Sequence, residues 1–385
     1  MKKLGDIGKI ITGNTPKTSD PKNYETRSIC FVKPSDIAED KITRILCSEF
    51  YISEYAREKA RIVPPESVLV TCIGSIGKVA ISGIECAINQ QINAIIPDSS
   101  KCNAEYLAYL LQYKKSELQL MANAPVVPIL NKSQFSELSI ELPSLDEQKI
   151  VNQRLNKITN IISLRQQQLA KLDELVKARF VEMFGDFSNN SKNWKTILFN
   201  QCFDIASSKR ILKSEWKSEG IPFLRVRDMV QLATMGKTDN EFFISEELYA
   251  SLSDADGIPQ RGDILVSATS TLGKCYVIGP GERYYFKDAD VLRFRPKIDI
   301  NSVFFMEQMK TDYIKEQIAR TLGITTVAHF TIKAAKNISM RYPDIKIQNE
   351  FADFVRQVEK SKLFIQKSLE YIKILKRSLM QQYFG

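Results

Sequence analysis

The chain has 385 residues, 44% of them hydrophobic and 26% charged, which is ordinary for a globular protein and long enough for two or three domains. Its formal net charge of +9 permits a polyanionic partner but does not require one. No run of about 18 apolar residues is present, and the N-terminus MKKLGDIGKI is too polar for a signal peptide, so the sequence predicts a cytoplasmic protein without membrane contact.

Residues 1–145 are predicted to form a mixed α and β domain, because short β-rich apolar runs alternate with Gly, Pro and Asn. A single helix is expected over residues 104–121, with its leucines on one side. The strands we expect are residues 28–32, 67–72, 78–82 and 93–96.

A long helix is predicted over residues 146–185. Ser144 and Glu147 form a Ser-x-x-Glu capping box just after Pro143, and Gly185 supplies a terminator. At alternating spacings of four and three, eight of ten positions from Val151 onward are apolar, with no internal Pro or Gly. This pattern is typical of a coiled coil, although a single helix with this pattern would also suit the core of a helix bundle.

The chain then repeats itself. A second mixed domain is expected over residues 186–345, opening on the polar linker DFSNNSKN, and a second long helix over residues 346–385. FVKPSDI at residues 31–37 matches FLRVRDM at residues 223–229, and FYISE at residues 50–54 matches FFISE at residues 242–246. The LVT…SIGK run that ends at Lys78 matches the LVS…TLGK run that ends at Lys274. The difference in residue number between matching positions grows only from 192 to 200 along the chain. Two diverged copies with small insertions give this pattern.

Two helices in the same register favour packing on each other, and chain order favours an antiparallel pair. The fold class predicted is α+β, with two globules separated by two long antiparallel coiled-coil helices and an internal pseudo-two-fold repeat. The apolar positions at spacings of four and three form the seam along which the two helices would pack. Four basic residues interrupt this seam and are expected at its edges: Arg165, Arg179, Lys362 and Lys376. The predicted helix-pairing positions are Val151, Leu155, Ile158, Ile162, Leu169, Leu172, Val176, Met183, Phe351, Val355, Val358, Ile365, Leu369, Ile372, Leu379 and Tyr383.

Sequence signals for catalysis are missing. The seven cysteines are scattered without a CxxC pair and are expected to be reduced, mostly buried thiols, and the single histidine excludes a multi-histidine metal site. Neither a P-loop, a GxSxG elbow nor the Asn-Pro-Pro-aromatic motif of a base amino-methyltransferase is present. We therefore expect no catalytic residues, no cofactor and no metal.

Two related globules on helices of equal length suggest a protein with two recognition domains held at a fixed separation. Duplex DNA has local two-fold symmetry, so a two-headed protein can read two half-sites at a spacing that the protein fixes. Since the two globules have diverged, the half-sites are expected to differ in sequence.

The duplicated order of globule and long helix resembles the specificity subunit of type I restriction-modification enzymes. The resemblance rests on the Pro143 to Gln148 and Pro343 to Gln348 helix entrances, the Phe-Gly exits and the paired Gly-Lys loops, and it covers essentially the whole chain. It implies target-recognition domains at 1–145 and 186–345, and spacer helices at 146–185 and 346–385. It also implies double-stranded DNA, two methyltransferase subunits and ATP-dependent restriction subunits as partners.

Arg225 and Arg227 are the first candidates for DNA contact. They alternate at a predicted strand end and so would share a face, and guanidinium suits guanine O6 and N7 or phosphate. Lys33 and Ser35 are their equivalents. A solvated strand edge is the alternative for all four.

Further DNA candidates lie in equivalent loops and on one strand. Gln90 and Gln91 would suit adenine, with a buried polar ladder as the alternative, while Arg293, Arg295 and Lys297 alternate as a phosphate-facing stripe. The loop candidates are Ser75, Lys78, Thr271, Lys274, Thr325 and His329.

Two competing functions remain open from the sequence. A non-enzymatic scaffold whose two globules bind proteins would show no sequence-selective DNA binding at any salt concentration. An autonomous nuclease or methyltransferase would act on DNA without partner subunits.

Overall fold

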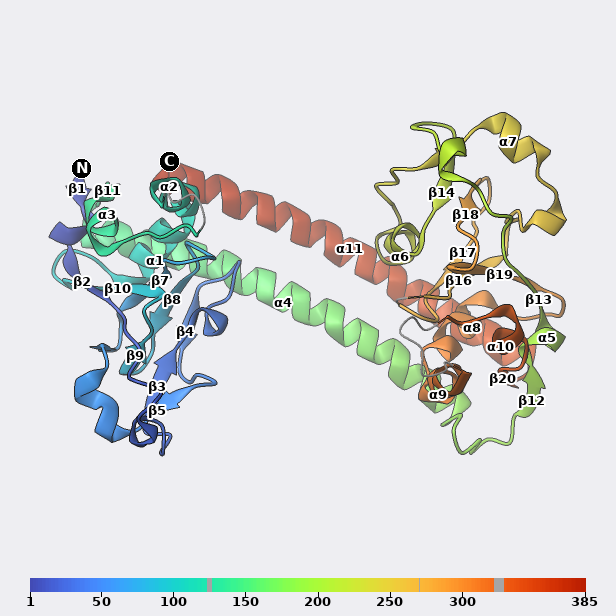
Figure 1. Ribbon diagram of the computed structural model, residues 1–385, viewed down its shortest axis with the longest axis horizontal. Coiled ribbons are helices and arrows are strands. Elements are labelled where there is room, and N and C mark those ends of the chain that lie inside the picture. The colour runs from blue at the N-terminus through green and yellow to red at the C-terminus, as the bar shows by residue number, and fades with distance from the viewer. Residues whose placement is uncertain (123–126, 270, 322–328) are drawn as a thin grey trace. The chain divides into compact units, whose positions relative to one another are not determined.

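The computed structural model describes residues 1–122, 127–269, 271–321 and 329–385 (Figure 1). The chain forms two compact units. The first comprises Met1–Gln166 and Gln366–Gly385, and the second comprises Gln167–Ile365. Each unit therefore contains one globule together with a segment of both long helices.

The first globule is built on three sheets. Its strands are β1 (Lys2–Lys3), β2 (Gly8–Thr12), β3 (Ile29–Val32), β4 (Thr43–Ile45), β5 (Tyr51–Ile52), β6 (Ile62–Val63), β7 (Val68–Thr71), β8 (Val79–Ser82), β9 (Cys86–Ile88), β10 (Ile92–Pro97) and β11 (Ser139–Ile140). The largest sheet has the order β2-β10-β7-β8-β4, antiparallel except where β4 runs parallel to β8. The others are β5-β3-β9-β6 and β1-β11. All four strands expected from the sequence are confirmed as β3, β7, β8 and β10.

The short helices of this globule correct one prediction. They are α1 (Ala104–Tyr113), α2 (Lys115–Met121) and α3 (Lys132–Glu137). The helix expected over residues 104–121 is broken at Lys114, whose ψ of 12° ends the first segment. The break still allows Leu107, Leu111 and Leu118 to be buried in one core.

The second globule repeats the strand pairing of the first. Its strands are β12 (Lys195–Leu198), β13 (Phe203–Ala206), β14 (Ile221–Leu224), β15 (Phe243–Ile244), β16 (Ile264–Ser267), β17 (Cys275–Val277), β18 (Tyr285–Phe286), β19 (Val291–Pro296) and β20 (Ser339–Tyr342). The sheets have the orders β13-β19-β16-β17, β15-β14-β18 and β12-β20. These correspond to β2-β10-β7-β8, β5-β3-β9 and β1-β11, so the internal repeat extends to the topology.

The second globule also carries short helices that surround its sheets. They are α5 (Phe199–Cys202), α6 (Val226–Met235), α7 (Glu246–Ser251), α8 (Ser302–Met309), α9 (Asp312–Thr321) and α10 (Ile332–Lys336). The prediction that Arg225 and Arg227 extend a strand is wrong. Strand β14 ends at Leu224 and α6 begins at Val226, because the Asp228 carboxylate accepts the Arg225 backbone N–H at 3.0 Å and caps the new helix.

The two long helices are α4 (Leu145–Phe184) and α11 (Ile345–Phe384), each of 40 residues. The capping box is confirmed, because the backbone N–H and the Oγ of Ser144 donate to Glu147 Oε2 at 2.9 and 2.7 Å. These hydrogen bonds lower the pKa of Glu147. At the other end of α4, Gly185 has a φ of +74°, a left-handed conformation that suits glycine.

Within each unit the long helices pack antiparallel. In the first unit, Val151 and Leu155 near the start of α4 share a core with Met380 near the end of α11. In the second unit, Phe180 near the end of α4 packs edge-on against Phe351 near the start of α11, with ring centroids 5.4 Å apart. The predicted antiparallel pair is therefore present in both units.

All sixteen predicted pairing positions are buried or half-buried, but the seam departs from a strict heptad. Near the end of α4 the core position is Phe180, 5% exposed, in place of Arg179. In α11, Met380 is likewise more buried than Leu379. A straight helix drifts by about 20° per heptad relative to a 3.5-residue repeat, so the seam must shift by one residue along its length.

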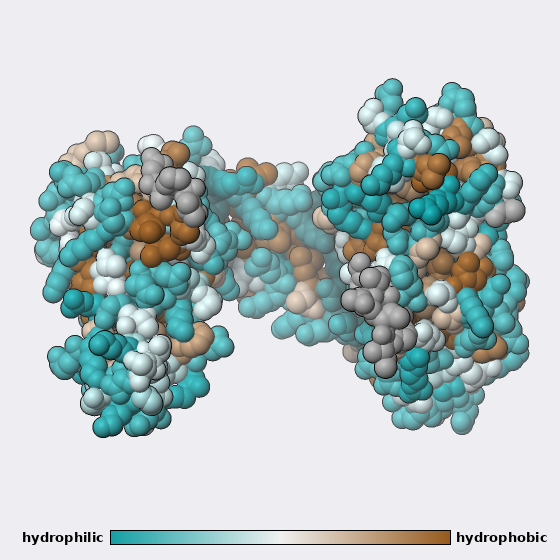
Figure 2. Space-filling view, viewed as in Figure 1, coloured by the Kyte–Doolittle hydropathy of each residue, from teal (hydrophilic) through white to brown (hydrophobic). Residues whose placement is uncertain are grey.

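Apolar side chains are also exposed along both long helices, as brown patches on the helical segments show (Figure 2). Leu164 and Leu175 of α4 are 58% and 47% exposed, and their equivalents Phe364 and Leu375 of α11 are 72% and 51% exposed. The repeat thus extends to surface positions that the helix pair leaves uncovered.

The basic residues in the seam have different surroundings. The Lys362 ammonium forms ion pairs with Asp173 at 2.8 Å and Glu359 at 2.7 Å, which suits the expected edge position. Lys376 departs from it, because it is half-buried with its Nζ 5.7 Å from the ring centroid of Tyr109. Burial lowers the pKa of Lys376.

Each long helix is tied to its own globule by one buried glutamine. Gln148 is fully buried. Its side-chain N–H groups donate to the carbonyls of Pro143 and Lys101 at 2.9 and 3.0 Å. Its Oε1 accepts a hydrogen bond from the backbone N–H of Asn103 at 2.8 Å. Gln348, also fully buried, makes the equivalent bonds to the Pro343 carbonyl and the Asn301 N–H, at 2.8 and 3.0 Å. Asn103 and Asn301 are the N-cap residues of α1 and α8, so each glutamine joins the start of a long helix to the start of a globule helix.

Replacing Gln148 with Ala should lower the free energy of unfolding of the first unit by about 3 kcal/mol, because three buried backbone groups lose their hydrogen bonds. Chemical denaturation followed by hydrogen exchange of α1 amides measures this loss. Gln153→Ala, at an exposed position of the same helix, is the control and should change stability by less than about 0.5 kcal/mol. Equal effects of the two substitutions would contradict the role given to Gln148.

Replacing Lys376 with Met should stabilise the chain by about 1 kcal/mol near neutral pH, because a partly desolvated ammonium is removed. The folded-state pKa of Lys376 lies below its ordinary value of 10.5, so the folded state binds fewer protons between the two values. The wild type should therefore gain stability relative to Lys376→Met as pH rises through that window. Denaturant titrations at several pH values measure the difference in free energy of unfolding between Lys376→Met and the wild type, with Lys373→Met at an exposed position as control. A difference that stays constant or grows as pH rises would contradict the prediction.

Candidate nucleic-acid interface

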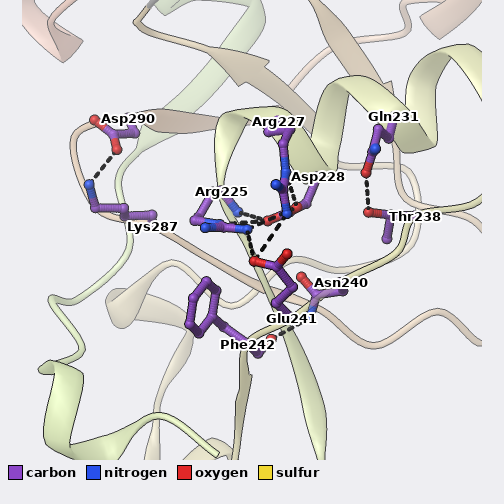
Figure 3. A network of polar contacts seen from close by, with 10 residues as sticks. All are labelled: Arg225, Arg227, Asp228, Gln231, Thr238, Asn240, Glu241, Phe242, Lys287 and Asp290. Atoms are coloured by element: carbon purple, nitrogen blue, oxygen red, sulfur yellow. Dashed lines mark hydrogen bonds and ion pairs between the residues drawn. The ribbon is translucent and has the colours of Figure 1, made fainter. Parts of the chain in front are cut away.

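The first candidate arginines meet at one compact ionic cluster at the start of α6 (Figure 3). The Arg225 guanidinium contacts Asp228 at 3.0 Å and Glu241 at 3.2 Å. Arg227 contacts the same two carboxylates, each at 3.3 Å. The two arginines therefore come together through common acidic partners, not through alternation along a strand as the sequence predicted.

Aromatic rings back this cluster. The Arg225 guanidinium carbon lies 4.3 Å from the ring centroid of Phe242, and the Phe242 ring lies 4.5 Å from that of Trp216. Arg227 has the more accessible side chain, 53% exposed, and its hydrogen bonds to Asp228 and Glu241 raise its pKa. The stack fixes the plane of one guanidinium while leaving the other at the surface.

The first globule contains an equivalent cluster. The Lys33 backbone N–H donates to Asp36 Oδ2 at 2.8 Å, as Arg225 does to Asp228, and a 3-10 turn at Pro34–Asp36 takes the place of α6. The Lys33 Nζ lies 3.2 Å from the ring centroid of Phe50, the counterpart of Phe242. Ser35, exposed, stands where the second globule has Arg227. The two globules thus share a cation on an aromatic ring, but the second adds a guanidinium.

The paired loops are confirmed as connections between antiparallel strands β7 and β8, and β16 and β17. In each loop a hydroxyl from the first strand accepts the N–H of the lysine, from Lys78 to Thr71 at 3.0 Å and from Lys274 to Ser267 at 2.9 Å. Gly77 and Gly273 have φ of +86° and +74°, which explains the glycine before each lysine.

The loop side chains differ in availability. Ser75, Thr271 and Lys274 are exposed, whereas the Lys78 ammonium lies 3.4 Å from Glu39 and its side chain is only 19% exposed. Lys274 is therefore better placed than Lys78 to reach a phosphate.

Gln90 and Gln91 lie directly after strand β9, and their side chains contact residues of the same globule. Gln90 is exposed and its Oε1 accepts a hydrogen bond from the Thr15 hydroxyl. Gln91 is half-buried and its Oε1 accepts from Asn89 Nδ2 at 3.2 Å. Gln90 remains a candidate, while Gln91 is partly engaged within the globule.

The predicted phosphate-facing stripe is not a continuous exposed surface, because only Lys297 of its three residues is exposed. Arg293 is 2% exposed, with its guanidinium 2.9 Å from Asp204 and 3.8 Å from the buried Asp263. Arg295 binds Asp263 at 2.9 Å. Strands β13 and β16 flank β19, so both arginines are paired with carboxylates of the same globule and are not part of the proposed interface. Lys297 is exposed, and its Nζ donates to the Asn200 carbonyl.

The last candidate loop is only partly described. Thr325, and the residues 124–126 that match this segment in the first globule, lie outside the described residues. His329 is exposed, just before the buried Phe330.

Sequence reasoning missed Asp228, Glu241 and Phe242 as functional neighbours of the arginines. The repeated FYISE and FFISE segments signalled that Phe50 and Phe242 were structurally equivalent, but nothing in the sequence placed them under Lys33 and Arg225. A hollow of about 560 Å³ also went unpredicted; beside Trp216 it is lined by three basic side chains and two acidic ones, Arg210, Lys213, Lys287, Asp288 and Asp290.

The cysteines lie mostly in the cores. Six of the seven cysteines are buried, as expected, and burial raises the pKa of Cys86, Cys102 and Cys202 to about 12. Across the described ranges, no group of His, Cys, Asp and Glu side chains is arranged to hold a metal ion. In the same ranges, no helix has an apolar stretch long enough to cross a membrane.

The duplicated globules with equivalent cation and aromatic clusters make this a protein of two related domains, and comparison with known proteins identifies its family. A model described as the type I restriction modification DNA specificity domain matches residues 1–174 and 191–373, one match for each copy. The chain therefore belongs to the type I restriction-modification DNA specificity family, whose specificity subunits are non-catalytic.

Relatives and solved structures agree with this family. The chain is 23% identical over 404 residues to the MjaIX specificity subunit of Methanocaldococcus jannaschii, covering 99% of this chain and 91% of that protein. It is 29% identical over 174 residues to the EcoR124I/EcoR124II specificity subunit of Escherichia coli, covering 42% of each.

Two structures share the fold over almost the whole chain. The S subunit from M. genitalium has a TM-score of 0.57 at 15% identity, covering 100% of this chain and 95% of its own. A chain solved in work on complex assembly and conformational transition of the type I R-M system has a TM-score of 0.64 at 16% identity, covering 99% and 96%. At these identities the likeness establishes the fold alone.

Proposed function

We propose that this chain is the sequence-specific DNA-recognition subunit of a type I restriction-modification complex, in which each globule reads one half of a split, asymmetric site. The observation that carries the proposal is the pair of equivalent clusters at Lys33 and Arg225. Each presents a cation on a phenylalanine ring at the same point of a repeated topology. The change from Ser35 to Arg227 between the copies supports half-sites of different sequence, because guanidinium favours guanine.

The target-recognition domains proposed are residues 1–145 and 186–345, and the spacer helices 146–185 and 346–385. The buried ties at Gln148 and Gln348 support a fixed spacer, because each helix starts from a rigid point on its own globule. The remaining contact residues proposed for DNA are Lys33, Ser35, Ser75, Lys78, Gln90, Gln91, Arg225, Arg227, Thr271, Lys274, Thr325 and His329.

The partners proposed are two methyltransferase subunits and ATP-dependent restriction subunits. Leu164 and Leu375 lie in the first unit and Leu175 and Phe364 in the second, so each unit exposes one member of both equivalent pairs. Equivalent exposed apolar positions in the two units support docking of two copies of one partner. We place the complex in the cytoplasm, where a bacterial or archaeal chromosome is accessible to it.

Mapping of methylated adenines in DNA from cells carrying this chain with its methyltransferase subunits tests the function directly. We expect a split motif whose two halves differ in sequence and are separated by a constant spacer. A continuous motif, or methylation that does not depend on this chain, would contradict the proposal.

Replacing Arg227 with Ala in the assembled complex should reduce discrimination at the second half-site about tenfold, because a bidentate guanidinium contact to a base is lost. Competition binding with cognate and single-base-changed duplexes measures this. Arg227→Lys should not restore discrimination, whereas a phosphate contact would be restored by Lys and would weaken all sequences alike. Arg283→Ala, at an exposed arginine of the same globule, is the matched control.

A further inference from the structure

We propose that Glu241 is a positioning residue that holds Arg225 and Arg227 until a matching base displaces it, and so sets the discrimination of the second globule against non-cognate DNA. The inference rests on the proposed function and assigns a specificity role to a carboxylate. Four charges in one cluster support this role (Figure 3).

The two carboxylates of the cluster differ in freedom. Asp228 is fully buried and its Oδ2 also accepts the backbone N–H of Arg225 at 3.0 Å, so it cannot leave without uncapping α6. Glu241 is 58% exposed and precedes the short strand β15. Glu241 is therefore the exchangeable partner.

A single oxygen of Glu241 serves both arginines. Oε2 lies 3.2 Å from Arg225 Nη2 and 3.3 Å from Arg227 Nη2. Two guanidinium groups and two carboxylates give the cluster no net charge, so it offers less attraction to phosphate than two unpaired arginines would. An incoming ligand must replace the lost ion pairs.

Guanine can make that replacement better than a general polyanion can. Its O6 and N7 accept two hydrogen bonds from one guanidinium, with the fork geometry that a carboxylate also uses. A base lacking this acceptor pair leaves an arginine separated from Glu241 without compensation. The carboxylate thereby penalises wrong sequences, which is how repulsive or unpaired elements produce specificity.

The first globule lacks this arrangement and provides an internal comparison. Glu49 occupies the position of Glu241, and its backbone N–H donates to Asp36 Oδ1 at 3.3 Å. In the described part of the chain, however, the Glu49 carboxylate forms no ion pair, and Lys33 is held by the Phe50 and Phe31 rings at 3.2 and 5.8 Å. Among the described residues, a glutamate paired with both cations of the cluster occurs in the second globule and not in the first.

The test compares Glu241→Gln with Glu49→Gln, which remove the same charge at equivalent positions of the two globules. Full-length chain assembled with its methyltransferase subunits is titrated with a cognate duplex and with one whose second half-site is scrambled, over a series of salt concentrations. Glu241→Gln should tighten the scrambled duplex more than the cognate one, so that the ratio of the two affinities falls roughly fivefold, because arginines freed from the ion pairs can contact phosphate whatever the sequence. Glu49→Gln should leave the ratio of the two affinities unchanged.

Three results would overturn the inference while leaving the proposed function intact. An unchanged ratio for Glu241→Gln shows that the carboxylate does not set discrimination. Selective loss of cognate binding shows that Glu241 itself contacts a base, and equal weakening of both duplexes shows a role in folding only. A wild-type complex that does not distinguish the two duplexes would instead overturn the proposed function, and this inference with it.

Discussion

The hydrogen bonds of two buried glutamines determine how the long helices leave their globules. Gln148 and Gln348 bind a proline carbonyl on the approach to the helix and an N-cap backbone N–H in the globule. An amide side chain is well suited to this position, because it both donates and accepts in one plane. The proline carbonyl and the N-cap N–H are both backbone groups. These hydrogen bonds therefore constrain the direction of the helix, while the surrounding side chains are free to differ. Globule surfaces can therefore diverge while the helix entrances remain the same.

The aromatic exits of the helices complete this arrangement. Phe184 ends α4 fully buried against Phe304 of α8, with ring centroids 4.8 Å apart. Phe384 ends α11 against Tyr106 of α1, at 5.3 Å. Each helix thus starts on one globule through a hydrogen-bonded amide and ends in the core of the other unit through a ring. The same helix of each globule, α1 or α8, receives both contacts.

The sequence predicted the repeat, the mixed globules, the helix limits and their antiparallel order, because these depend on local capping and on patterns that occur twice. Features decided by distant partners could not be predicted. Arg293 reads as part of an alternating basic strand, yet Asp204 and Asp263 arrive from two other strands and bury it. Arg225 begins a helix because of one carboxylate three residues later, and Glu241 joins that cluster from beyond the helix. The shift from Arg179 to Phe180 follows from helical geometry that a heptad pattern neglects.

The position of Phe384 has a consequence for the order in which the protein is made. All the strands and short helices of the first unit have been synthesised by residue 166, yet its core includes Met380, packed with Leu379, Tyr383 and Phe384. The nascent first globule therefore keeps apolar surface on α1 uncovered while the whole second globule is translated. During that interval α1 can bind the corresponding helix end of another, completed chain, so exchange of helices between chains competes with closure within one chain.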